Sequence, residues 1–169
     1  MNSQNGGNKM LIAVVSDSHG DNTSIRKALG KIKKADYLFH LGDNVEDIDG
    51  FSKEFKGKII NVKGNCDFLN SKLAKELDEK LIDIEGIKIL ATHGHKYGVK
   101  ENIFRLQYRA MELEANIVLY GHTHIPSIEY QEDIWLINPG SIALSRAKNN
   151  TLALIEVFNG RIIPSIIEI

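Results

Sequence analysis

The sequence predicts a mixed α/β domain with two sheets, and two features of its hydrophobic pattern support this. In the first half, short apolar runs alternate with segments of helical spacing, which is typical of βα units with buried strands. In the second half, apolar runs follow one another across turn signals, which favours hairpins. We therefore expect a mixed α/β domain with two sheets, and not a pure doubly wound sheet.

The first half is predicted to contain three βα-like units. Helices are expected at Asn22–Lys34, capped by Asn22 or Thr23, and at Val45–Phe55, which is weaker and acidic. The strands that alternate with them are Leu11–Val15, Tyr37–Leu41 and Lys58–Val62. A polar cluster follows each strand, and open α/β sheets bind ligands at the carboxyl ends of their strands.

The second half combines hairpins with one clear helix. Glu85-Gly86 is a hairpin signal, and Asn159-Gly160 is another near the end of the chain. A helix is expected at Lys100–Glu114, and Ser71–Glu79 is interpreted as a short helix or an excursion. The expected strands are Lys80–Ile84, Ile87–Ala91 and Ile117–Tyr120, followed by three or four more in Ser127–Ile169.

A chain of 169 residues favours one domain, and we find no linker that divides it. We expect residues 1–9, which are polar and rich in Asn and Gly, to be a disordered tail or a cloning remnant. Residues 10–169 would then form the single domain. No apolar run approaches the roughly 18 residues that a membrane span needs. The only cysteine, Cys66, can form no intrachain disulfide, which favours a reducing compartment and a cytoplasmic location.

Potential metal ligands gather directly after the predicted strands. Five of the six histidines lie in three short clusters, and two aspartates and an asparagine occupy similar positions. These eight residues are Asp17, His19, Asp43, Asn65, His93, His95, His122 and His124. Imidazole and carboxylate suit divalent Mn, Fe, Zn and Ni, whereas a structural zinc–thiolate site would need several cysteines. Eight ligands exceed the needs of one ion. Two ions about 3.5–4 Å apart could activate a bridging water and bind the oxygens of a phosphoryl group.

The order of these motifs closely resembles that of the calcineurin-like metallophosphoesterases, and in particular the small YfcE-type phosphodiesterases of bacteria and archaea. Asn138-Pro139-Gly140-Ser141 also resembles that branch. The motifs are Asp17-x-His19, Gly42-Asp43, Gly64-Asn65-Cys66-Asp67, His93-Gly94-His95 and Gly121-His122-x-His124. The resemblance extends from about residue 10 to the C-terminus. It implies a two-sheet β-sandwich flanked by helices, an αββα fold with metals at one rim.

The resemblance also implies a role for each ligand. Asp43 would bridge two ions, of which one is held by Asp17, His19 and His124 and the other by Asn65, His93 and His122. The implied function is hydrolysis of phosphate esters, phosphodiesters above all, by water or hydroxide that bridges the ions. Manganese is the expected metal, with Ni, Fe, Zn and Mg as alternatives. A phosphomonoesterase with the same mechanism is a second interpretation.

One position departs from the larger phosphatases of this superfamily. Those enzymes have a histidine after the Asn, and this histidine is their proposed general acid, whereas this chain has Cys66, as is usual in the YfcE-type branch. A thiol with a reference pKa of about 8.5 is a poor match for that role, so we expect Cys66 to be a small buried filler. His95 is the candidate catalytic acid, and a metal-bound water is the alternative. The position of His95 alone fits a substrate contact and an ordinary polar loop residue equally well.

Two further polar residues have structural interpretations. His40 lies within an apolar strand, which favours a hydrogen-bonded core residue over a ligand. Asp67 is expected either to orient a neighbouring histidine or to close its turn.

Two other classes of function compete with hydrolysis of phosphate esters. A scaffold like the retromer subunit Vps29 is one, but Vps29 lacks part of the ligand set that is filled here. A nuclease is the other. The net charge of −1 provides no global basic field, so nucleic acid is not an expected partner. The expected partner is a small phosphate-ester substrate. Binding to a membrane is not expected, and the sequence does not decide whether the chain forms a homo-oligomer.

Overall fold

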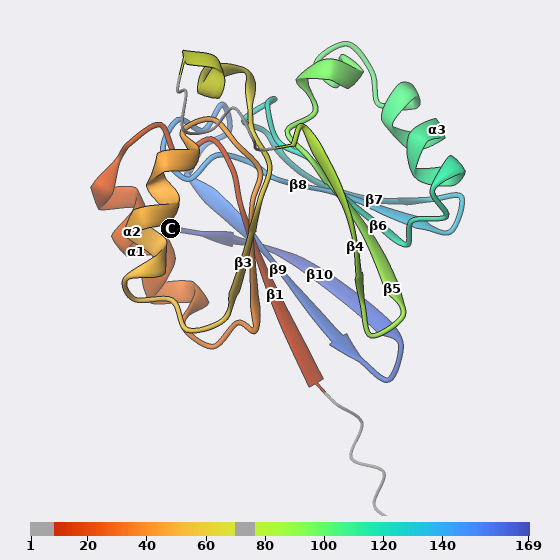
Figure 1. Ribbon diagram of the computed structural model, residues 1–169, viewed down its shortest axis with the longest axis horizontal. Helices are drawn as coiled ribbons and strands as arrows, with labels where there is room; N and C mark the ends of the chain where they lie inside the picture. Colours follow the sequence, from red (N-terminus) through yellow and green to blue (C-terminus); the bar gives the residue numbers. More distant parts are fainter. Residues whose placement is uncertain (1–8, 70–76) are drawn as a thin grey trace, which may run out of the picture.

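The fold is that of a computed structural model, which describes residues 9–69 and 77–169 (Figure 1). Two five-stranded sheets make up its β structure. In the first sheet the order is β10 (Arg161–Glu168), β9 (Thr151–Phe158), β1 (Lys9–Val15), β2 (Tyr37–His40) and β3 (Lys58–Asn61). In the second sheet the order is β4 (Glu79–Ile84), β5 (Ile87–Thr92), β6 (Ile117–Leu119), β8 (Ile134–Pro139) and β7 (Pro126–Gln131). The predicted two-sheet α/β sandwich is confirmed.

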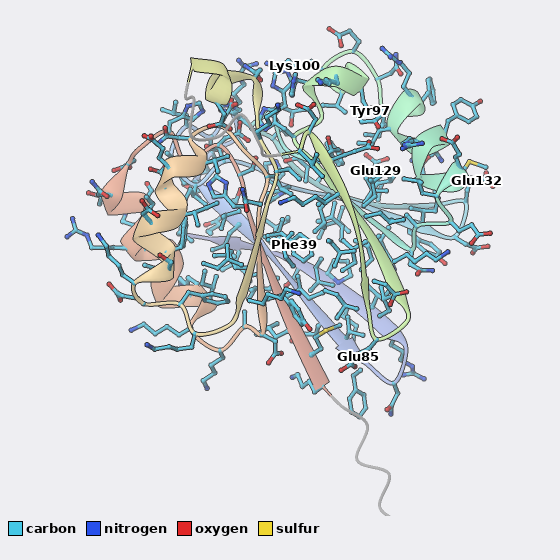
Figure 2. All side chains as sticks on the ribbon, viewed as in Figure 1. Phe39, Glu85, Tyr97, Lys100, Glu129 and Glu132 are labelled. Carbon is cyan, nitrogen blue, oxygen red and sulfur yellow. The ribbon has the colours of Figure 1, made fainter. Side chains whose placement is uncertain are left out.

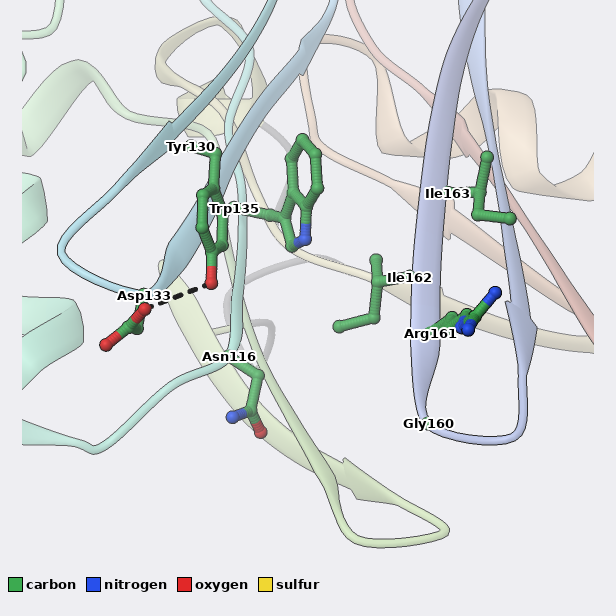
Figure 3. Close-up of a pocket in the computed structure, with 8 residues that line it drawn as sticks. All are labelled: Asn116, Tyr130, Asp133, Trp135, Gly160, Arg161, Ile162 and Ile163. Carbon is green, nitrogen blue, oxygen red and sulfur yellow. Dashed lines mark hydrogen bonds between the residues drawn. The ribbon is translucent and has the colours of Figure 1, made fainter.

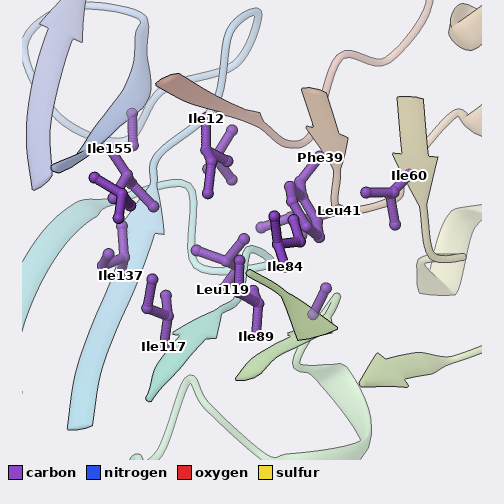
Figure 4. Close-up of a cluster of buried hydrophobic side chains, with 14 of the residues drawn as sticks. Ile12, Phe39, Leu41, Ile60, Ile84, Ile89, Ile117, Leu119, Ile137 and Ile155 are labelled. Carbon is purple, nitrogen blue, oxygen red and sulfur yellow. The ribbon is translucent and has the colours of Figure 1, made fainter. Parts of the chain in front are cut away.

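Apolar side chains between the two sheets form the main core (Figure 4). Ile12 and Phe39 from the first sheet and Ile89 and Leu119 from the second are fully buried in this cluster. Phe39 lies well inside the molecule, whereas Glu85 and Glu132 lie at its periphery (Figure 2). Burying one such apolar side chain contributes about 1.5–3 kcal/mol, so this layer is a main source of stability.

Helices cover the outer face of each sheet. On the first sheet, α1 (Asn22–Ile32) and α2 (Ile48–Ser52) share a buried apolar cluster with strand residues. On the second sheet, α3 (Phe104–Glu112) buries Leu106 and Ala110 against strand residues. Figure 1 shows the two helical layers on opposite sides of the sandwich. No helix among the described residues is long and apolar enough to cross a membrane.

Several element boundaries differ from those predicted. Asp21, not Asn22 or Thr23, caps α1, because its Oδ1 accepts the Thr23 N–H at 3.0 Å. The expected helix at Val45–Phe55 divides into the 3-10 turn η1 (Val45–Asp47) and α2. The helix expected from Lys100 begins at Phe104, because residues 95–101 form the 3-10 turn η4 (His95–Tyr97) and further turns.

Two predicted segments fall largely outside the described residues. The predicted tail is described only at Lys9, where β1 begins. The segment expected as a short helix or an excursion is described only from Leu77, and its last residue, Glu79, begins β4.

Strand register aligns the segments that follow the parallel strands. In the first sheet, Val15 lies opposite His40, and His40 lies opposite Asn61. In the second sheet, Leu119 lies opposite both Ala91 and Ile137. Parallel strands in register end at the same edge of their sheet, so the motifs after these strands lie side by side.

Candidate metal centre

Four predicted ligands from both sheets converge on one point. Asp17 and His19 follow β1, Asp43 follows β2 and His124 follows β6. One nitrogen or oxygen atom from each of them lies within 4.8 Å of the others. Asp17 is fully buried and Asp43 is nearly so, while the two histidines are half-buried. This group has the composition and spacing of a divalent cation site.

The three other predicted metal ligands meet beside this first group. His93 Nε2 lies 3.1 Å from Asn65 Oδ1 and 3.1 Å from His122 Nδ1. The same nitrogen lies 3.5 Å from Asp43 Oδ1. All seven side chains therefore lie at the end of the sandwich where β1, β2, β3, β5 and β6 finish. Of the two carboxylates, Asp43 lies closer to the second group, because Asp17 Oδ1 is 4.0 Å from the same His93 nitrogen.

Backbone carbonyls orient two of the imidazole rings. His93 Nδ1 lies 2.8 Å from the Leu41 carbonyl, and His124 Nδ1 lies 2.6 Å from the Leu144 carbonyl. A carbonyl can only accept, so each Nδ1 carries a proton and Nε2 is the nitrogen that faces the centre. Metal-binding histidines are commonly held by such an outer hydrogen bond.

The backbone at the centre is strained. Five of the seven predicted metal ligands have positive φ, although none is glycine: Asp17, His19, Asp43, His122 and His124. Left-handed backbone costs a non-glycine residue free energy and is concentrated at functional sites. Here the left-handed residues reverse the backbone after the strands, so that the ligand side chains stay at the rim of the sandwich.

Close backbone approach also depends on two glycines. A Cβ at Gly64 would lie 2.2 Å from Asp43 Oδ1, and a Cβ at Gly121 would lie 2.0 Å from Ser16 Oγ. No other residue type fits at these positions without displacing Asp43 or the segment that carries Asp17.

The electrostatics of the ligand-free centre are coupled. Burial alone would raise the pKa of Asp17, but the hydrogen bond with His124 and the charge of His93 outweigh it and hold this pKa below its usual value. The hydrogen bond with Asp17 raises the pKa of His124. Burial, followed by the charge of His93, lowers the pKa of His122 to about 4, which favours the neutral ring that a metal requires.

The residues present fit a divalent metal. His19 Nε2 is buried without a hydrogen-bond partner. Among the described residues, only histidines make ion-pair contacts with the buried carboxylates of Asp17 and Asp43. Two buried carboxylates without a fixed cation are costly, and bound cations would remove that cost.

His95 lies beside the cluster without joining its hydrogen bonds. Its ring centroid lies 5.4 Å from that of His93 and 6.1 Å from that of His122. Its Nδ1 is buried without a partner. Burial, followed by the charge of His93, lowers the pKa of His95, so the ring is more readily neutral in the ligand-free protein.

Cys66 is not the buried filler that the sequence suggested. The residue is exposed, although its N–H donates to Asp43 Oδ1 at 2.9 Å. Partial desolvation and the Asp43 carboxylate raise the pKa of the thiol to about 11. Cys66 is therefore a still poorer proton donor than its reference pKa suggests.

Supporting residues lie directly behind the ligands. His40 is fully buried and hydrogen-bonded with Ser18 Oγ at 2.9 Å, which confirms the structural interpretation. Ser141 Oγ donates to the Asp17 carbonyl at 2.8 Å, and Asn138 Nδ2 donates to the Gly121 carbonyl at 3.1 Å. The Asn138-Pro139-Gly140-Ser141 motif was a signal for these contacts, but it did not reveal which loops they join.

A separate pocket of about 480 Å³ lies at the other end of the second sheet, where β8 begins (Figure 3). Tyr130 and Trp135 form its aromatic wall, with ring centroids 4.8 Å apart, and Ile162 faces them from β10. No histidine lines it, and its only carboxylate, Asp133, accepts from the Tyr130 hydroxyl. This pocket lacks the grouped ligands of the candidate centre.

The family model for the calcineurin-like phosphoesterase superfamily domain matches residues 10–160. The chain belongs to this superfamily. The probable metallophosphoesterase YsnB of Bacillus subtilis is 34% identical over 140 residues, covering 82% of this chain and 79% of YsnB. The phosphodiesterase YfcE of Escherichia coli K12 is 27% identical over 167 residues, covering 83% of each chain.

Solved structures agree with this membership. A predicted phosphoesterase from Streptococcus pneumoniae superposes with a TM-score of 0.81 at 32% identity, covering 95% of this chain and 90% of that one. The chain is therefore a metallophosphoesterase with YfcE-like relatives, and its family acts on small phosphate-ester substrates.

Proposed function

We propose that this metallophosphoesterase hydrolyses phosphodiesters at a centre of two divalent ions. The observation that carries the proposal is the position of Asp43. Its carboxylate belongs to the four-residue group around Asp17 and also lies 3.5 Å from His93 Nε2 in the second group. A carboxylate shared by two clusters of ligands suits a pair of ions better than one ion.

The seven residues divide between the two positions. Asp43 would contact both ions, while Asp17, His19 and His124 would hold one and Asn65, His93 and His122 the other. Such ions, when bound, supply Lewis acidity and a nucleophilic water at neutral pH. We propose manganese as the metal, because imidazole, carboxylate and amide oxygens together suit it.

The charge balance of the metal-loaded centre would favour an anionic substrate. Asp17 and Asp43 are the two carboxylates in the ligand set, so two divalent ions would leave the centre positive by about two charges. A phosphodiester carries one negative charge. With both ions bound, the centre would therefore attract the phosphate group, while the neutral imidazoles would hold the ions without cancelling their charge.

His95 is the proposed proton donor to the leaving group. It lies beside both His93 and His122 but keeps a buried, unpartnered Nδ1. Although burial lowers its pKa in the ligand-free protein, an adjacent phosphate would raise that pKa again and favour the protonated ring. Exposed Cys66, with its pKa of about 11, is less suited to this role.

Two other functions remain outcomes of the test. A phosphomonoesterase would use the same seven ligands. A non-catalytic scaffold would not require that all seven side chains be competent ligands, which they are in this chain. We further propose a cytoplasmic location, which suits an exposed, unpaired Cys66.

The test is hydrolysis of bis-p-nitrophenyl phosphate by protein loaded with Mn²⁺. We expect turnover that a chelator abolishes and Mn²⁺ restores. A strong preference for p-nitrophenyl phosphate at full metal loading would instead identify a monoesterase. Absence of hydrolysis of both esters by fully loaded protein would favour the scaffold.

The same assay tests His95. His95→Ala should slow alkyl diesters much more than nitrophenyl diesters, because a nitrophenolate departs with little protonation. Equal losses on both substrates would assign His95 to substrate binding. Lys88→Ala, a substitution at an ion pair with Glu114 on the other end of β5, provides the control.

A further inference from the structure

Asp67 lies where two loops of the candidate centre cross, and its buried carboxylate accepts four backbone N–H groups. Oδ1 accepts from Asn44 at 2.8 Å and from Val45 at 2.8 Å. Oδ2 accepts from Asp43 at 3.0 Å and from Gly64 at 2.7 Å. One side chain therefore joins the loop after β2 to the loop after β3.

These contacts stabilise an unfavourable backbone conformation in the loop after β2. Asp43 and Asn44 are consecutive left-handed residues, with φ of 56° and 82°. Their conformation turns three successive N–H groups toward one point, where a carboxylate can accept all of them. Successive backbone N–H groups arranged in this way form an anion-binding nest, which a charged acceptor stabilises.

The contact between the loops is reciprocal. Asp67 accepts the backbone N–H of Asp43, while the Asp43 side chain accepts the backbone N–H of Cys66 at 2.9 Å. The two loops approach so closely that a Cβ at Gly42 would lie 2.4 Å from Gly64 N. The position of the Asp43 carboxylate relative to Asn65 is therefore set by the crossing that Asp67 holds.

Asp67 is neither a metal ligand nor an orienter of histidine. A carboxylate offers about four lone-pair sites, and four N–H groups occupy them. The expectation that Asp67 orients a neighbouring histidine is not met, since these partners are all backbone amides. Its contact with Gly64, three residues earlier, closes the turn, which is the second role that the sequence predicted for Asp67.

We propose that Asp67 is a positioning residue that fixes Asp43 and Asn65 at the separation needed for the second ion of the centre. This inference rests on the proposed function, because it concerns a shared carboxylate between two ions. Asp17, His19 and His124 make no contact with Asp67 and should retain the first ion without it.

The experiment compares Mn²⁺ binding by the full chain and by Asp67→Asn. Asparagine keeps the shape but replaces one carboxylate oxygen with an NH₂ group, which faces N–H donors instead of accepting from them. Loss of an outer-shell partner typically costs roughly 10–100-fold in metal affinity. We expect titration calorimetry to show one ion bound as in the wild type and the second weakened by about that factor.

Electron paramagnetic resonance provides a readout that general destabilisation would not mimic. The wild type with two ions should give the spectrum of an exchange-coupled Mn²⁺ pair. Asp67→Asn at the same loading should give mainly the six-line spectrum of isolated Mn²⁺. Asp36→Asn is the matched control, because Asp36 Oδ2 accepts the Leu11 N–H at 2.8 Å at the far end of the same strands. It should keep the coupled spectrum.

Each outcome has a distinct meaning. Wild-type affinity for both ions and a coupled spectrum in Asp67→Asn would overturn the positioning role, as would equal loss of both ions by a folded variant. If Asp67→Asn does not fold, Asp67→Glu retains the charge and undergoes the same measurements, with the second ion again expected to be the weaker. A wild type that binds only one ion would instead refute the dinuclear proposal, and that result needs no variant.

Discussion

His40 lies directly beneath the candidate centre as a neutral, doubly hydrogen-bonded ring. Its Nδ1 accepts the Gly42 N–H at 3.3 Å, so its Nε2 carries the proton that is donated to Ser18 Oγ. Burial lowers its pKa below the usual value. The folded protein therefore binds fewer protons at His40 than the unfolded chain does.

Because the folded state binds fewer protons at His40, the free energy of unfolding should decline on acidification. As pH falls below the unfolded-state pKa of about 6.5, the unfolded chain is protonated first, and the free energy of unfolding falls by up to about 1.4 kcal/mol per pH unit for this group. Urea denaturation of chelator-treated protein at a series of pH values should show this slope. His40→Gln should be less stable near neutral pH but show a shallower slope. Parallel slopes would exclude His40 as the responsible group.

The second residue-scale prediction concerns Asp43, the carboxylate of the first group that lies closer to His93 in the second. Asp43→Asn should lose more activity than Asn65→Ala at the same Mn²⁺ loading, because it removes a charge shared by two ions. The loss should exceed the roughly 10–100-fold effect typical of an outer-shell partner. Steady-state hydrolysis of bis-p-nitrophenyl phosphate measures it. Near-normal turnover by Asp43→Asn would contradict the bridging role.

At the scale of elements, the centre depends on how closely the segments after β1 and β6 approach. Ser16 lies against Gly121, whose position allows no side chain, and the His122 N–H donates to Asp17 Oδ2 at 3.2 Å. The two segments come from different sheets. Their contact is therefore what places Asp17 beside His122 and His124.

Gly121→Ala tests this approach. The added Cβ would lie 2.0 Å from Ser16 Oγ and 3.0 Å from Asp17 Oδ2, so the segments must separate. We expect a destabilisation of about 1–3 kcal/mol and weaker Mn²⁺ binding. Thermal unfolding and calorimetry measure the two effects.

Gly30→Ala is the matched control. Gly30 lies within α1, and a Cβ there has no neighbour within 4 Å. The alanine should stabilise the protein by about 0.5–1 kcal/mol without changing metal affinity. If both alanine variants bound Mn²⁺ like the wild type, close approach at Gly121 would not be required for the centre.

At the scale of the whole molecule, the ligands link the two sheets. Asp17, Asp43 and Asn65 follow strands of the first sheet, and His93 and His122 follow strands of the second. An ion bound between them favours the state in which the two sheets are packed together. Metal binding and unfolding should therefore be coupled.

Adding Mn²⁺ should raise the melting temperature of the metal-free protein. A ligand at 100 times its Kd adds about 2.7 kcal/mol per site, which corresponds to roughly 5–10 °C for a chain of this size. Scanning calorimetry with and without Mn²⁺ measures the shift, and excess chelator should reverse it. His93→Gln should show a smaller shift. A melting temperature independent of Mn²⁺ would contradict a centre that joins the sheets.

Much of the local structure could be predicted from the sequence alone. Apolar runs predicted β1, β2 and β3 to within about two residues at each end, since periodicity and polarity are local properties. The type and order of the ligands also pointed to the family that the comparisons then showed. Helix limits were less accurate, as at Lys100–Glu114, because turns around Gly98 interrupt the helical pattern.

Only the tertiary structure decided how these local features meet. The sequence indicated that Asp43 and Asn65 follow strands, but the strand register and the left-handed backbone determine that their side chains converge. It did not identify Asp67 as the acceptor of four backbone N–H groups from two loops, nor did it place Cys66 on the surface. The physical reason is range: periodicity reports which face of one element is buried, whereas a contact across two sheets depends on the packing of every element between them.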